Sequence, residues 1–258
     1  MSLAPNANNI LLGRGAVYFD RFNASGVKQG KYHLGNVETF EITNTPDVRE
    51  KFSSMDKDSG LLKQVTVRLD VDIKLTGSEL NADNMALALF GTSSLFAQNG
   101  ATLVDETISP AGGTVQGRYY QTAEREISAV TVDDDAILVV DDGTNYVITD
   151  ATVGIIKVVV GGSIADGSVL TASYTSAAIA NRPQVAGANV AQIEGELTFV
   201  GDPAAGQAVE VVFWMASVTP DGPVALLGDD FGVWALNFKA LDDKANHPNE
   251  PFYRYLEI

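Results

Sequence analysis

The clearest pattern along the chain is a strict alternation of apolar and polar residues between Val65 and Thr76. Its apolar members are Val65, Val67, Leu69, Val71, Ile73 and Leu75. Successive side chains of a β-strand point to opposite faces, so the pattern predicts one long strand with a buried and a polar face. At about 3.3 Å per residue this strand would span roughly 40 Å, longer than most strands. Such a length suits a sheet that continues beyond one subunit.

Other segments predict further strands. The same alternation recurs in residues 17–19, 40–42 and 193–199, whereas residues 209–215 and 233–241 carry apolar side chains on both faces. Strands of the second kind are typical of sheets that are covered on both sides. We therefore expect a mainly β protein.

One helix is predicted over residues 82–90. Asn81 can cap its first turn, and Asp83 lies where the helix dipole favours an anion. Gly91 follows as a stop signal. Met85 and Leu89 are spaced to pack together on a sheet.

Residues 107–180 differ in texture from the rest of the chain. Short valine-rich and isoleucine-rich runs are separated by the turn pairs Asp142-Gly143, Gly161-Gly162 and Asp166-Gly167. We interpret this region as an inserted β subdomain of about four strands, which splits a main domain into residues 1–106 and 181–258. The flanks, residues 109–117 and 177–187, are rich in Gly, Pro, Ala and Ser and are expected to be connectors.

Residues 45–63 form a densely charged segment with Ser59-Gly60 near its tip. Six of its charged residues are candidate contact residues: Arg49, Glu50, Lys51, Asp56, Lys57 and Asp58. The segment predicts an exposed hairpin. It is either a solvated loop or an arm that grips a neighbouring subunit.

Composition narrows the classes of function. The 258 residues contain no cysteine and carry a formal net charge of −16. The absence of cysteine excludes disulfides, thiolate metal sites and a cysteine nucleophile. The negative net charge argues against binding of nucleic acid through its phosphates. We expect no signal peptide and no membrane span, and a protein kept in the cytoplasm until assembly.

Catalytic patterns are not found in the sequence. His33 and His247 are the two histidines and neither lies in a metal-binding motif, and Gly13-Arg14-Gly15 lacks the rest of a dinucleotide fingerprint. Aspartate clusters, including residues 133–135, lack the spacing of a calcium loop. We expect no enzyme, cofactor or metal, although two carboxylates that meet in space could still form a glycosidase site.

The order of several pieces along the chain is informative: residues 13–22, 32–36, 81–87, 117–121, 146–148, 218–223 and 226–231, together with the charged segment and the long strand. This order resembles the major tail tube proteins of siphovirus-type bacteriophages, which have long non-contractile tails. The resemblance runs nearly from end to end of the chain.

The resemblance implies a β-sandwich with one flanking helix, whose subunits close into hexameric rings and stack as a hollow virion tail. It implies residues 45–63 as the arm between rings. We expect the insertion on the outer surface, where it would not block the bore. The implied partners are further copies of the chain, the tape measure protein, and the tail terminator and distal tail proteins. Phage DNA would pass through the lumen without specific binding.

Acidic residues on the polar faces of the predicted strands are candidates for the lumen wall. They are Glu41, Asp70, Asp72, Glu194 and Glu196. Like-charge repulsion would keep DNA from adhering to such a wall, although Arg68 and Lys74 on the same faces count against it.

Two alternatives remain at the level of sequence. The inner tube of a contractile tail or of a secretion system would share the ring-forming fold. A glycan-binding or calcium-binding β module would belong to a different class.

Overall fold

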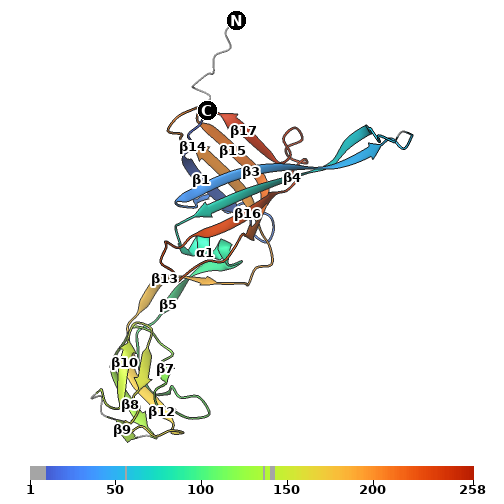
Figure 1. Ribbon diagram of the computed structural model, residues 1–258. Helices are drawn as coiled ribbons and strands as arrows, with labels where there is room; N and C mark the ends of the chain where they lie inside the picture. Colours follow the sequence, from blue (N-terminus) through green and yellow to red (C-terminus); the bar gives the residue numbers. More distant parts are fainter. Residues whose placement is uncertain (1–9, 56, 136, 140–142) are drawn as a thin grey trace. The chain divides into compact units, whose positions relative to one another are not determined.

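The chain is mainly β and divides into two compact units. The computed structural model describes residues 10–55, 57–135, 137–139 and 143–258. Unit 1 contains the chain up to Ser94 together with Gln184–Ile258, and unit 2 contains Leu95–Pro183 (Figure 1). Both units are built from antiparallel strands.

Unit 1 contains an eight-stranded antiparallel sheet, counted over the described residues. Seven strands follow one another in the order β2 (Tyr32–His33), β1 (Gly15–Arg21), β14 (Ile193–Gly201), β15 (Val209–Pro220), β16 (Trp234–Ala240), β4 (Leu61–Gly77) and β3 (Val37–Phe52). The eighth, β17 (Tyr253–Glu257), pairs with the first half of β15, and β16 pairs with its second half. This order leaves β3 as an edge strand.

The sheet folds back over a shared core. Phe40 of β3 stacks on Phe199 of β14 with ring centroids 4.9 Å apart, and Phe19 of β1 meets Phe238 of β16 at 5.5 Å. Strands from distant positions in the order are thus in contact across the core, an arrangement consistent with a β-sandwich. The largest fully buried apolar side chains of this core are Trp234, Phe19, Phe213, Phe238, Leu34, Ile73, Leu75 and Leu87.

The long strand predicted from the alternation is confirmed, and it extends from Leu61 to Gly77 as β4. Its predicted burial is only half correct. Val71, Ile73 and Leu75 are buried, but the apolar positions before them are exposed. The reason is that β16 pairs with β4 only from Asp72 to Gly77, so the first part of β4 has β3 as its sole partner among the described residues.

β3 and the first part of β4 form a two-stranded hairpin that projects from the rest of unit 1 (Figure 1). We call residues 45–70 the arm, because Thr45 and Asp70 are register partners close to where the β16 pairing ends. The register shifts twice along the arm, between Asp47 and Val48 and between Lys51 and Phe52. The predicted exposed hairpin of residues 45–63 is therefore the outer part of a longer one.

The predicted helix is confirmed as α1 (Ala82–Ala88), and Asn81 caps it by accepting a hydrogen bond from the Asn84 backbone N–H at 2.8 Å. It ends two residues before the predicted limit. Phe90 adopts a left-handed backbone with φ of 47°, and the Gly91 N–H closes the turn on the Ala86 carbonyl at 2.7 Å. Within the described residues, no helix is long and apolar enough to span a membrane.

Unit 2 contains two small antiparallel sheets around a second core. One has the order β10 (Tyr146–Asp150), β11 (Ile155–Val158), β7 (Tyr119–Gln121), and the other β6 (Ala101–Thr107), β12 (Leu170–Ser176), β8 (Ile127–Asp134), β9 (Ile137–Val139). Tyr146, Tyr174, Ile156 and Ile164 are among the buried side chains of this core. The unit thus has an apolar interior of its own.

The insertion is larger than the predicted residues 107–180. β6 pairs with β12, so residues that the sequence placed in the main domain belong to unit 2. The predicted connector over residues 177–187 contains a strand, β13 (Ile179–Ala186), which pairs with β5 (Thr92–Gln98). The predicted turn at Asp142-Gly143 lies partly outside the described residues.

Candidate assembly surface

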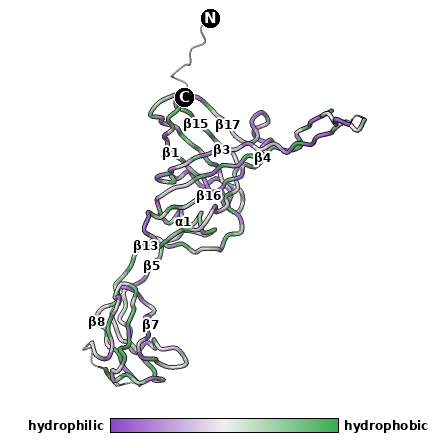
Figure 2. Tube along the Cα trace, in the orientation of Figure 1, coloured by the Kyte–Doolittle hydropathy of each residue, from purple (hydrophilic) through white to green (hydrophobic). Residues whose placement is uncertain are grey.

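The arm exposes large apolar side chains on both of its strands and at its tip. Met55 is 92% exposed and Val67 is 61% exposed, and the others are Phe52, Leu61, Leu62, Val65 and Leu69. Figure 2 shows hydrophobic positions recurring along the arm between hydrophilic ones. A solvent-exposed surface that carries this many large apolar side chains is typical of an interaction site.

The sequence singled out the arm by its charges and missed this apolar content. The signal was present, because Leu61-Leu62 follows directly on a charged tip and the alternation at Val65 and Val67 continues from it. An alternating pattern predicts a buried face, and only the structure shows that this part of the strand has no second layer to bury it.

The predicted contact residues lie as follows. Arg49, Glu50 and Lys51 are in β3, and Lys57 and Asp58 are in the tip, whereas Asp56 lies outside the described residues. All five described residues are exposed.

Three cations share one face of the arm, and we call them the basic face: Arg49, Lys51 and Lys63. Arg49 is opposite Val65 and Lys51 is directly opposite Lys63, while Glu50 and its partner Gln64 face the other way. Like charges directly opposite one another destabilise a strand pair. None of the three forms a salt bridge with a described residue. Asp47 lies on the same side of β3 as Arg49 and Lys51 but forms no salt bridge with either, so the basic face keeps an excess of positive charge.

The edge of the sheet adds a second feature that favours assembly. Over the described residues β3 pairs with β4 alone, so its outer backbone groups have no strand partner along 16 residues. Such an edge is a template for another strand unless it is blocked. Pro46 interrupts it at one position.

Three of the predicted lumen residues lie together. Glu41, Asp70 and Asp72 share one face of the β3–β4 pair, because their register partners alternate without a shift between Thr39 and Asp47. Asp70 forms salt bridges with Arg68 at 3.0 Å and with Lys239 at 3.2 Å. The face is thus mixed in charge.

The other two predicted lumen residues lie elsewhere, on β14. Glu196 is only 4% exposed, and its carboxylate is paired with Lys28 and, at 2.7 Å, with Lys31. Burial would raise the pKa of Glu196, but the hydrogen bonds from the two lysines outweigh it and hold that pKa below the usual value. In the described chain Glu196 is not part of an exposed acidic surface.

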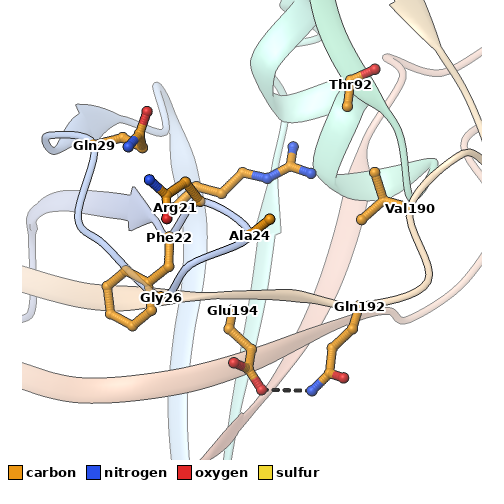
Figure 3. Close-up of a pocket in the computed structure, with 10 residues that line it drawn as sticks. Arg21, Phe22, Ala24, Gly26, Gln29, Thr92, Val190, Gln192 and Glu194 are labelled. Atoms are coloured by element: carbon orange, nitrogen blue, oxygen red, sulfur yellow. Dashed lines mark hydrogen bonds between the residues drawn. The ribbon is translucent and has the colours of Figure 1, made fainter.

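Glu194 lines a surface cavity of about 630 Å³ in unit 1. In Figure 3 the Arg21 side chain extends into this cavity, and Gln192 and Glu194 lie on another wall. Arg21 donates to the Gly91 carbonyl at 3.0 Å, and Gln192 donates to Glu194 at 2.6 Å. These polar groups of the cavity are therefore occupied by contacts within the chain.

The two histidines make structural contacts. Nδ1 of His33 accepts from the Gly35 N–H at 3.1 Å. His247 stacks on Trp214 with centroids 3.8 Å apart and bonds to Asp243 at 2.8 Å. No group of three or more potential metal ligands occurs among the described residues.

One buried phenol has a shifted pKa. Burial and a hydrogen bond to Glu106 raise the pKa of Tyr174 to about 12, so this phenol stays protonated at neutral pH. Tyr174 belongs to the core of unit 2, where it acts as a hydrogen-bond donor.

Comparison with known proteins gives a family without an assigned activity. The sequence profile described as "Protein of unknown function UCP028589" matches residues 10–258. No curated protein matches the chain.

Proposed function

Because the chain belongs to the family UCP028589 of unknown function, we propose its function from its own geometry and sequence: it is a structural subunit that assembles with copies of itself. More specifically, we propose the major tail tube protein of a long non-contractile phage tail. In that role hexameric rings stack into a hollow tube through which DNA is ejected. The arm is the observation that carries the proposal of self-assembly.

The arm supports self-assembly on physical grounds. Its exposed apolar side chains gain free energy when a partner removes them from water, by about 25 cal/mol for each Å² buried. The unpaired edge of β3 can accept a further strand, and closure into a ring would remove such edges. Because β3 continues as a 16-residue edge strand beyond the part of the sheet that β16 completes, this edge is available to a partner.

The tail tube assignment rests on the resemblance of the sequence, and the mainly β fold with one short helix is compatible with it. The mixed charge of the face that carries Glu41, Asp70 and Asp72 changes one part of the hypothesis. If this face lines a lumen, its ion pairs leave it only weakly acidic, so DNA would slide past with little attraction or repulsion.

Negative-stain electron microscopy tests the proposal directly. Purified protein at high concentration should show rings or hollow filaments, and sedimentation velocity at low concentration should show smaller species. Association should depend on concentration because it is driven by contacts between copies. A sample that remains monomeric at every concentration, both alone and with the other tail proteins of the same phage, would argue against a tube.

A further inference from the structure

A second exposed segment of unit 1 has the opposite charge to the basic face of the arm, although the five basic and five acidic residues of the whole arm balance. The β15–β16 loop, residues 221–233, contains three aspartates and no basic residue. Leu227 and Phe231 are each 95% exposed, and Leu226 is exposed as well. Asp221 accepts from Lys74 at 3.3 Å, whereas Asp229 and Asp230 form no ion pair with a described residue.

The arm and this loop are complementary. The arm combines exposed apolar side chains with the basic face of Arg49, Lys51 and Lys63, and the loop combines exposed apolar side chains with Asp229 and Asp230. Opposite charges at an interface select a partner and fix its register, while apolar contacts supply most of the affinity. The two segments can therefore bury apolar surface together, and the basic face can neutralise Asp229 and Asp230.

We propose that the β15–β16 loop of one copy docks on the arm of a second copy. The proposal rests on the proposed function and names the surface that receives the arm. A contact between the arms of two copies would bring two basic faces together, and a contact between two loops would bring aspartates together. Repulsion between like charges disfavours both contacts. When arm-to-loop contacts run head to tail, they generate rings or open filaments.

A second copy fits the arm better than nucleic acid does. The basic face has three cations, while the whole chain has a net charge of −16, which would repel a polyanion brought close to it. A second copy instead offers the β15–β16 loop, which carries both acidic and exposed apolar side chains. Nucleic acid is retained as an outcome of the test.

Cross-linking between two single-cysteine variants tests the contact, because the chain has no cysteine of its own. Leu62→Cys places a thiol on the arm and Leu227→Cys places one on the loop. The two proteins are mixed and treated with a short thiol-specific cross-linker, and linked peptides are identified by mass spectrometry. With the two proteins in equal amounts, the mixed 62–227 product should exceed the sum of the 62–62 and 227–227 products, because random pairing would make it equal to that sum.

A matched control uses Val160→Cys, since Val160 lies in unit 2 and is 73% exposed. The 62–160 product should stay at the level of random collision. Adding Lys51→Glu and Lys63→Glu to the arm variant should lower the 62–227 yield about tenfold, and adding Asp229→Lys and Asp230→Lys to the loop variant should restore it.

The outcomes separate the contact from the proposed function. If wild-type protein forms rings or tubes and the 62–227 yield equals the 62–160 yield, the docking proposal is overturned and the tube remains. If wild-type protein forms no assembly, the proposed function falls and this inference with it. Binding of duplex DNA to the wild-type chain that is lost in the Lys51→Glu, Lys63→Glu variant would overturn the proposal in favour of nucleic acid.

Discussion

The two halves of β4 should respond in opposite ways to polar substitution. Leu61, Val65 and Val67 are about half exposed, whereas Ile73 on the same strand is fully buried. We expect the triple variant Leu61→Gln, Val65→Thr, Val67→Thr to fold normally and to assemble poorly. Threonine keeps the β-branched shape of valine, so the propensity of the strand for β-structure changes little.

The magnitude follows from the exposed surface. Full burial of a large apolar side chain is worth about 1.5–3 kcal/mol, so burying the remaining half is worth about 1 kcal/mol for each of the three residues. The loss of about 3 kcal/mol per contact should raise the protein concentration at which assembly begins by roughly 100-fold. The free energy of unfolding of the free subunit should change by less than about 0.5 kcal/mol per site.

The assay measures both quantities on the same protein. Light scattering and negative-stain microscopy give the concentration at which assembly begins, and urea unfolding at low concentration gives the stability of the subunit. Ile73→Ala is the control. It should lower the free energy of unfolding by about 2–5 kcal/mol, because it leaves a cavity in the core.

One result would refute this reasoning. If the triple variant lost as much unfolding free energy as Ile73→Ala and assembled at the wild-type concentration once folded, the apolar side chains of the arm would support the fold of the subunit and not its association.

Three further predictions concern the arm, the candidate lumen face and Glu196. Deletion of Arg49 through Leu61 should leave a folded subunit that does not polymerise, and tubes of normal length by electron microscopy would contradict the role of the arm. Reversing Asp70 and Asp72 to lysine in an infectious phage should slow genome ejection, measured as DNA release on receptor addition; normal ejection from well-formed tails would remove this face from the lumen. Glu196→Gln should cost about 1 kcal/mol of unfolding free energy at neutral pH. Because the pKa of Glu196 is lowered in the folded state, this difference should be present above the ordinary glutamate value of 4.5 and vanish as the pH falls through the folded pKa, which urea unfolding at a series of pH values would show.

Sequence reasoning found the elements whose signals are local. The alternation that ends at Thr76 predicted β4 because a period of two needs no knowledge of the partner strand. Asn81 predicted the start of α1 because the cap is made within one turn. The end of the helix was less accurate, since Phe90 rather than a glycine takes the left-handed backbone there.

Features that depend on distant parts of the chain were not predictable in this way. Val67 and Val71 have the same place in the pattern, but only Val71 lies where a second layer covers the strand. Glu194 and Glu196 also look alike in the sequence, yet Glu196 is buried and paired with two lysines that precede it by more than 160 residues. The strand β13 was missed because its pairing with β5 joins segments far apart in the sequence.

The arm has one more consequence, which concerns the kinetics of growth. A ribbon of two strands without a third is only marginally stable in water, so the backbone hydrogen bonds of the arm should open far more often than those of β14 or β15. Docking must then offset the conformational entropy lost when the ribbon becomes ordered. Two free subunits that meet for the first time bury little surface, so they offset little of this loss. A subunit that joins the end of an existing assembly buries its arm along the whole length and offsets more of it. Growth would therefore show a lag that preformed ends abolish, and the amides of the arm would exchange slowly with solvent only after a subunit has been incorporated.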